Sequence, residues 1–326
     1  MSDLIAILDC NFPNTNAEER IASAAGFQLV KGTCQTEEDV SSFAVAASAM
    51  IVQYAPLTAR VIRELPRCRV IARYGIGVDN IDVAAATAAG IWVTNVPGFC
   101  AAELAEHTLA MLLSLNRRLP ILDASVRSNE WETIGLMRPT RRLSALTLGL
   151  VGLGQVGREV ARLAQAFGMT VLATAPRTTA EAMASVGVTA VTLEALLTRS
   201  DVVSFHLPLT PASHHLLDAT RIRLMKNSAI VINTSRGSIV HEAALIAALV
   251  EGRQAGAGLD VFEAEPPRPD NRLLGMRNVI LTPHAAFYSD DSLAFLQASV
   301  AEEVVRVLQG EPPRSPVNPT NSPRVV

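Results

Sequence analysis

The chain has few aromatic residues, few cysteines and no long hydrophobic run. Phe, Trp and Tyr make up 4% of its 326 residues, and its four cysteines, at positions 10, 34, 68 and 100, form no CxxC pair. No disulfide framework and no thiolate metal site are therefore expected. No apolar run approaches the roughly 18–20 residues that span a bilayer, so we expect no membrane segment.

An excess of either charge is also missing. The chain has 28 Lys and Arg against 31 Asp and Glu, a net charge of −3 at pH 7. Neither nucleic acid nor an anionic membrane is therefore expected as a partner. The first ten residues contain no Lys or Arg, and their apolar core, Leu4–Leu8, is short, so no secretory leader is expected. Hydrophobic residues make up 49% of the chain, so we expect a globular protein. Its length predicts two cores, and its scattered cysteines favour a cytoplasmic location.

Short apolar segments alternate with segments of helical spacing along the whole chain. This alternation predicts βαβ units, and hence an α/β fold with two doubly wound parallel sheets. The expected strands are Leu4–Leu8, Phe27–Val30, Ala49–Gln53, Val70–Ala72, Trp92–Thr94, Thr147–Val151, Thr170–Thr174, Asp201–Phe205, Ala229–Asn233, Gly256–Asp260 and Asn278–Leu281.

The pattern breaks at Pro97-Gly98, which indicates a hinge between two domains. A helix is expected over Ala101–Leu119, with one apolar face that includes Leu112. The connector Pro120–Ala145 is long and irregular, so it is expected to pack on something, either a partner subunit or its own domain. A last helix is expected over Asp290–Gln309, followed by an extended, proline-rich tail.

The strongest local signal is the glycine pattern that follows the strand Thr147–Val151. Gly152 permits a tight turn, Gly154 lets a pyrophosphate approach the backbone, and Gly157 lets the helix pack closely on the strand. The next helix begins at this loop, and its free N–H groups favour phosphate. The segment therefore predicts a dinucleotide site.

The end of the next strand bears on the choice between NAD and NADP. An acidic residue about 20 positions beyond the glycine loop holds the adenosine ribose in NAD enzymes, but that place is occupied by Ala175. Arg177 and nearby hydroxyl groups could hold a 2′-phosphate instead, which favours NADP. The alternative is a solvated Arg177 and an NAD enzyme without that contact.

Three polar residues follow later strands of the same series: Arg236, Glu265 and His284. The carboxyl ends of parallel strands share one edge, so these side chains should gather there. Arginine can pair with a substrate carboxylate, and histidine can give a proton to a nascent alkoxide. A neighbouring carboxylate orients the histidine and favours its protonated form. Together they predict a hydride-transfer site for a 2-oxo acid.

The remaining histidines give weaker signals. His206 ends a strand and is expected to face the cofactor, whereas His241 is expected to cap a helix. His214 and His215 are adjacent, so their side chains are expected to diverge. His107 lies on the helix 101–119, in a core or an interface. No HxxxH or Cys/His cluster predicts a metal site.

Blocks of residues in a fixed order resemble the D-2-hydroxyacid dehydrogenase family. Within that family, 213–216 and 284–289 are similar to the branch of the C-terminal-binding-protein corepressors, which has Trp where this chain has Phe287. The matching blocks are 73–82, 95–98, 105–109, 152–157, 206–210, 233–237, 259–262 with 265–266, and 282–284.

The resemblance implies roles for these residues. Arg236, Glu265 and His284 match the catalytic trio. The substrate would contact 74–77, where backbone N–H groups grip its carboxylate, together with Arg236 and Phe287; the residues of that segment are Tyr74, Gly75, Ile76 and Gly77. The implied contacts of an NADP or NAD cofactor are Thr108, Gly152, Gly154, Gln155, Val156, Gly157, Arg177, His206, Pro208, Thr234 and Asp260.

The resemblance also implies an architecture and an assembly. A substrate-binding domain, 1–98 with 286–326, would enclose an inserted Rossmann domain, 99–285. A homodimer would form through the helix 101–119 and the arm that follows it. The expected activity is NAD(P)H-dependent reduction of a small 2-oxo acid to the D-2-hydroxy acid, and the alternative is a dinucleotide-sensing scaffold like the corepressors.

Overall fold

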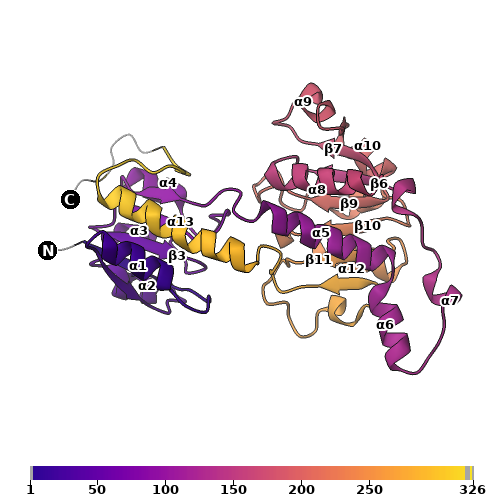
Figure 1. Cartoon of the computed structure of the whole chain (residues 1–326), viewed down its shortest axis with the longest axis horizontal. Helices are drawn as coiled ribbons and strands as arrows, with labels where there is room; N and C mark the ends of the chain where they lie inside the picture. Colours follow the sequence, from indigo (N-terminus) through magenta and orange to yellow (C-terminus); the bar gives the residue numbers. More distant parts are fainter. Residues whose placement is uncertain (1–2, 320–323, 325–326) are drawn as a thin grey trace. The chain divides into compact units, whose positions relative to one another are not determined.

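The computed structural model describes residues 3–319 and 324, and it divides into two compact units. Unit 1 combines Met1–Phe99 with Ser289–Val326, and unit 2 is Cys100–Tyr288. Each unit is a parallel sheet with helices on both faces, as the alternating pattern predicts (Figure 1). The borders lie within a few residues of those expected, and the functional assignment of each unit stays a prediction.

Unit 1 has a five-stranded sheet of order β2-β1-β3-β4-β5, in which all paired strands are parallel. β3 is buried along its whole length, which explains its continuous apolar sequence. The strands are β1 (Leu4–Ile7), β2 (Gln28–Lys31), β3 (Ala49–Val52), β4 (Val70–Arg73) and β5 (Trp92–Thr94). The helices are α1 (Asn16–Ala24), α2 (Glu37–Ala44), α3 (Ala59–Arg63), α4 (Val83–Ala88) and α13 (Asp290–Leu308).

The last helix, α13, completes unit 1 from the far end of the chain. Ser289 caps it by accepting a hydrogen bond from the Ser292 N–H, and Gly310 follows its end with a φ of 87°. α13 packs against α1 and against β3 and β4 of the sheet. After it, the Val317 N–H donates to the Val93 carbonyl at 2.7 Å, so the extended tail runs beside β5. The predicted final helix is confirmed.

Unit 2 has a seven-stranded parallel sheet of order β12-β11-β10-β9-β6-β7-β8. The chain order reverses between β6 and β9, and ligands bind at such switch points in α/β sheets. The strands are β6 (Thr147–Val151), β7 (Thr170–Thr174), β8 (Thr189–Ala190), β9 (Val202–Phe205), β10 (Ile230–Asn233), β11 (Gly256–Leu259) and β12 (Val279–Leu281). The helices that cover it include α5 (Ala101–Asn116), α8 (Gln155–Ala166), α9 (Ala180–Ala184), α10 (Leu193–Arg199), α11 (Ala219–Ile222) and α12 (Glu242–Val250).

The segment after α5 differs from expectation. The helix ends at Asn116, because Arg118 adopts a left-handed conformation with φ 54°, and a new helix, α6 (Leu119–Arg127), begins. The connector expected to be irregular also contains α7 (Ile134–Met137) and the 3₁₀ turn Leu143–Ala145. The apolar face of the helix 101–119, with Leu112, was expected at a dimer contact. This is wrong for Leu112, because its side chain is fully buried in the core of its own unit.

None of the helices within residues 3–319 is both long enough and apolar enough to cross a membrane.

Candidate active site

The glycine loop lies between the end of β6 and the first turn of α8. Gly152 has a φ of 102°, and a Cβ there would lie 2.2 Å from the His206 carbonyl oxygen. A Cβ on Gly157 would lie 2.4 Å from the Gly152 oxygen, so helix and loop pack as the pattern predicts. At Gly154 the space is open, with no heavy atom within 4 Å of a Cβ. The loop therefore has the form that a pyrophosphate requires, above the helix end carried by Gln155 and Val156.

The histidine and the glutamate of the expected trio lie in direct contact. His284 Nδ1 is 2.7 Å from Glu265 Oε2, although the two residues follow different strands, β12 and β11. The other carboxylate oxygen, Oε1, accepts a hydrogen bond from the Phe262 N–H at 3.1 Å. Both side chains keep solvent access, with 29% of His284 and 37% of Glu265 exposed. The pair is thus oriented and still able to exchange a proton.

The electrostatics of Glu265 favour its ionised form. Burial by itself would raise its pKa, but the hydrogen bond and charge of His284, the Phe262 N–H and the positive charge of Arg236 together lower the pKa below its usual value. Arg236 follows β10, and its Nη1 donates to the Ser235 carbonyl at 2.7 Å. A negative carboxylate beside an imidazole stabilises the protonated ring, which is the form that donates a proton.

A buried carboxylate holds the backbone around His284. Asp260 is 1% exposed and accepts hydrogen bonds from the Thr282 hydroxyl at 2.6 Å, the Ala285 N–H at 2.8 Å and the Ala286 N–H at 3.0 Å. His284 itself has a left-handed φ of 52°, and its N–H donates to the Asp260 carbonyl at 2.8 Å. A non-glycine residue adopts this conformation only where its surroundings impose it.

Comparison with known proteins decides the family. A family model described as "D-isomer specific 2-hydroxyacid dehydrogenase, NAD binding domain" matches residues 109–286. A glyoxylate reductase of Korarchaeum cryptofilum is 42% identical over 265 residues, 81% of this chain and 80% of the relative. The chain belongs to the D-isomer specific 2-hydroxyacid dehydrogenase family. It is therefore an oxidoreductase with a nicotinamide dinucleotide cofactor, and the resemblance found in its sequence is confirmed.

Further relatives include a longer chain and proteins solved with different dinucleotides. A D-3-phosphoglycerate dehydrogenase of Archaeoglobus fulgidus is 38% identical over 90% of this chain, which spans only 55% of that relative. A D-lactate dehydrogenase of Aquifex aeolicus, solved with NAD and lactic acid, has a TM-score of 0.86 and 30% identity, covering 95% of this chain and 96% of that chain. An acyclic imino acid reductase solved with NADPH and D-Arg has a TM-score of 0.86 and 27% identity, covering 97% and 100%. The corepressor branch is not specified by any of these comparisons.

Several expected cofactor contacts of the dehydrogenase gather at the carboxyl ends of β9 and β10. Burial lowers the pKa of His206 to about 4, so its ring is neutral near pH 7, and its Nε2 lies 2.9 Å from Ser204 Oγ. Thr108 is fully buried, and its hydroxyl lies 3.2 Å from the Thr234 hydroxyl. The Pro208 carbonyl accepts a hydrogen bond from Ser213. Their contacts with a cofactor stay predictions.

The loop after β7 carries no carboxylate at the expected ribose position. Ala175 is half-buried, and its carbonyl accepts a hydrogen bond from the Thr178 N–H at 3.0 Å. Arg177 is exposed. These positions agree with either reading of Arg177, so the preference for NADP stays a prediction.

In unit 1, the expected substrate loop follows β4. The Tyr74 side chain is buried, at 2% exposure, whereas Ile76 is 38% exposed. The Asn95 amide donates to the Ile76 carbonyl at 2.7 Å, and the Val96 N–H donates to the Gly75 carbonyl at 2.9 Å. The carbonyl groups of Gly75 and Ile76 therefore have partners in unit 1. Its role toward a substrate, like that of Phe287 in unit 2, stays a prediction.

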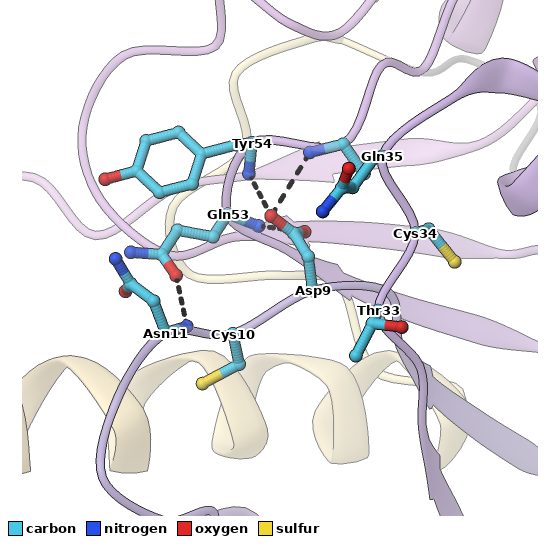
Figure 2. Close-up of a pocket in the computed structure, with 9 residues that line it drawn as sticks. Asp9, Cys10, Asn11, Thr33, Cys34, Gln35, Gln53 and Tyr54 are labelled. Carbon is cyan, nitrogen blue, oxygen red and sulfur yellow. Dashed lines mark hydrogen bonds between the residues drawn. The ribbon is translucent and has the colours of Figure 1, made fainter. Parts of the chain in front are cut away.

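A pocket of about 380 Å³ lies at the same edge of the unit 1 sheet, beyond the ends of β1, β2 and β3. Figure 2 shows the Asp9 carboxylate inside it, with hydrogen bonds to the N–H groups of Gln53 and Tyr54 at 2.9 and 2.6 Å. The Gln53 side chain in turn accepts a hydrogen bond from the Asn11 N–H. The sequence analysis did not find this carboxylate, which fixes the end of β3.

The positions of the other histidines differ from expectation at His214 and His215, and they reveal a contact of Glu263. The rings of His214 and His215 do not diverge; their centroids are 3.9 Å apart, because His215 adopts a left-handed φ of 49°. His215 Nε2 lies 2.9 Å from Glu263 Oε1, so Glu263 is not a partner of His284. His241 caps α12, as expected. Among the residues that the structure describes, no group of His, Cys, Asp and Glu could hold a metal ion.

His107 is a further residue whose place the sequence did not decide. Its Nε2 lies 3.0 Å from the Thr282 hydroxyl and 3.8 Å from Asp260 Oδ1. It therefore belongs to the group that holds the segment around His284. The signal in the sequence was its position in the family block 105–109, which carried no indication of its contact.

Proposed function

We propose that the chain reduces a small 2-oxo acid to the D-2-hydroxy acid, reversibly, with His284 as the proton donor. The observation that carries this proposal is the 2.7 Å contact between His284 and Glu265, with Arg236 close enough for its charge to lower the Glu265 pKa. A partly exposed imidazole beside an ionised carboxylate is suited to general acid catalysis. Family membership supports the reaction class.

Each residue of the trio has a separate task. Arg236 binds the substrate carboxylate and polarises the neighbouring carbonyl, since a guanidinium can donate two parallel hydrogen bonds. We further propose that the backbone N–H groups of Gly75–Gly77 bind a substrate carboxylate. Bound at the glycine loop, the nicotinamide cofactor supplies the hydride. His284 then protonates the alkoxide oxygen, and Glu265 keeps the ring oriented and favours its charged form.

The substrate is proposed only as a class, and a panel of 2-oxo acids tests it. NADPH and NADH oxidation would be followed with glyoxylate, hydroxypyruvate, pyruvate and bulkier 2-oxo acids. Turnover of at least one of them is expected, since relatives include glyoxylate reductases and D-lactate dehydrogenases by name. Tight dinucleotide binding without turnover of any acid would contradict the proposal and favour a dinucleotide-sensing scaffold.

We propose NADP as the preferred cofactor. Ala175 leaves the ribose position without a carboxylate that would repel a 2′-phosphate, and the exposed Arg177 in the same loop can approach one. A structural relative carries NADPH and another carries NAD, so both are compatible with this fold.

We also propose a homodimer, formed through the arm after α5. This arm exposes large apolar side chains: Leu119 is 52% exposed, Val126 56%, Ile134 68% and Trp131 89%. Apolar side chains gathered on one exposed segment are typical of an interface. Replacing Trp131 and Ile134 by Glu should give a monomer in sedimentation experiments, whereas an unchanged dimer would place the interface elsewhere.

A further inference from the structure

A carboxylate in unit 1 is completely buried. Glu18 on α1 is 0% exposed, and the donors to its oxygens are neutral groups. The Tyr74 hydroxyl donates to Oε1 at 2.5 Å, and the Gln297 amide of α13 lies 3.0 and 3.2 Å from the two oxygens. The same amide donates to the Asn14 carbonyl at 2.7 Å. Removing a carboxylate from water is costly, so this arrangement must be held by precise packing.

The Glu18 carboxylate binds the hydroxyl group of Tyr74, the first residue of the loop that follows β4. Tyr74 immediately precedes Gly75, whose φ of 134° is one that side chains rarely adopt. The Tyr74 ring packs edge-on against Phe12, with centroids 5.1 Å apart, and its N–H donates to the Val52 carbonyl. Burial, together with the charge of Glu18, raises the pKa of Tyr74 above its usual range, so the phenol keeps the proton that it donates. Tyr74 is thus held by contacts of its ring, its backbone N–H and its hydroxyl group.

We propose that Glu18 is a positioning residue for the substrate carboxylate. Through the Tyr74 hydroxyl it sets the orientation of the peptide groups of Gly75–Gly77, and these groups bind the carboxylate. The inference rests on the proposed function, since it assumes a 2-oxo acid at this loop. Nothing in the reaction passes through Glu18 itself.

The test separates positioning from simple stabilisation. Tyr74→Phe removes the donor but keeps the ring, and Glu18→Gln keeps an acceptor for the phenol. Misplaced N–H groups weaken carboxylate binding equally in the ground and transition states, so KM should rise with little change in kcat. We expect KM for the best 2-oxo acid to rise about tenfold in Tyr74→Phe, a change equivalent to about 1.4 kcal/mol. The rise should be smaller in Glu18→Gln, and KM for NAD(P)H should not change.

Gln297→Leu is the matched control. It removes the other donor to the same carboxylate and leaves the bond between Tyr74 and Glu18 in place, so it should lower the melting temperature without raising KM. Equal KM values in wild type and Tyr74→Phe, or equal increases in Tyr74→Phe and Gln297→Leu, would overturn the inference and leave the proposed function intact.

A second measurement does not depend on turnover. Amide hydrogen exchange of the segment 73–77 should be faster in Tyr74→Phe than in Gln297→Leu, and the protection of this segment by oxamate should be reduced. If the wild type reduces no 2-oxo acid and oxamate does not protect the segment, the proposed function fails together with the inference. Protection by oxamate that is the same in all variants would contradict the inference alone.

Discussion

The two units use their carboxylates in different ways. In unit 1, Glu18 is buried and accepts hydrogen bonds from groups that do not titrate near neutral pH. In unit 2, Glu265 is partly exposed, and its partner is an imidazole that can gain or lose a proton. Unit 2 also contains a carboxylate like that of Glu18. The oxygens of Asp260 accept hydrogen bonds from a hydroxyl and two backbone N–H groups.

A carboxylate with a structural role and one with a chemical role therefore differ in their donors and in their access to solvent. A carboxylate that holds the backbone is surrounded by donors with fixed protons, and solvent access would weaken its bonds. A carboxylate that assists proton transfer needs a titrating partner and a path to water or substrate. Both kinds lie at the carboxyl edges of parallel sheets, so position in the fold does not distinguish them.

The largest effect is expected from His284→Ala. This change removes the proton donor, and general acid–base catalysis typically contributes about 10²–10⁴-fold to the rate. kcat for 2-oxo acid reduction should fall by such a factor, with an unchanged melting temperature. His215→Ala is the control, since His215 forms a comparable pair with Glu263 at 2.9 Å and is similarly exposed. Equal losses of kcat in both variants would show that the pair of His284 and Glu265 has no catalytic role that the pair of His215 and Glu263 lacks.

A second prediction concerns His206, a histidine of unit 2 whose ring is partly shielded from solvent. The pKa of His206 is lowered to about 4 in the folded state. As the pH falls below about 6.5, His206 therefore binds a proton in the unfolded chain but not in the folded one, which favours unfolding. Its contribution to stability is complete above pH 6.5 and is lost as the pH falls toward 4.

The matching measurement is urea unfolding of wild type and His206→Gln at pH 7 and pH 4.5. Between these values the wild type should lose about 2–3 kcal/mol more than the variant, because each pH unit below 6.5 costs about 1.4 kcal/mol. An identical acid-induced loss in both proteins would show that the His206 ring is accessible to protons in the folded state.

A third prediction concerns the cofactor. Wild type should have a higher kcat/KM with NADPH than with NADH, and Ala175→Asp should reverse the order, since a carboxylate repels a 2′-phosphate and accepts hydrogen bonds from a free ribose. Steady-state kinetics with both cofactors measure this. A wild type that prefers NADH tenfold, equivalent to about 1.4 kcal/mol, would contradict our interpretation of this loop.

The smallest effect is expected from Glu265→Gln. The ionised carboxylate stabilises protonated His284, and a neutral amide of the same shape does not. The alkaline limit of reduction and the acid limit of oxidation should both move down. Paired pH–rate profiles in the two directions measure this shift. If activity falls while neither limit moves, the two residues are not coupled in proton transfer.

Most of the fold could be predicted because its strands are short, apolar and separated by helices. β3 and β9 are buried along their whole length, and such strands read as continuous apolar runs. β8 was missed because two residues, Thr189–Ala190, carry no periodicity. The break after α5 was missed because it depends on the left-handed conformation of Arg118, which an arginine rarely adopts.

The candidate site could be predicted in part, for a topological reason. Residues that follow parallel strands come to one edge, so Glu265 and His284 could be paired from the sequence, and their contact is observed. The stacking of His214 on His215 could not, because it depends on one backbone angle. The contact between Glu18 and Tyr74 joins residues far apart in the chain, with no pattern to relate them.

The two-part composition of unit 1 has a consequence for the order of folding. All the strands and helices of unit 2 lie in one continuous stretch, so this unit can fold as soon as that stretch has left the ribosome. The strands of unit 1 are made first, yet the face that α13 covers has no partner until α13 has been synthesised. Glu18, made early, receives the Gln297 amide only then. Unit 1 is therefore begun before unit 2 and completed after it.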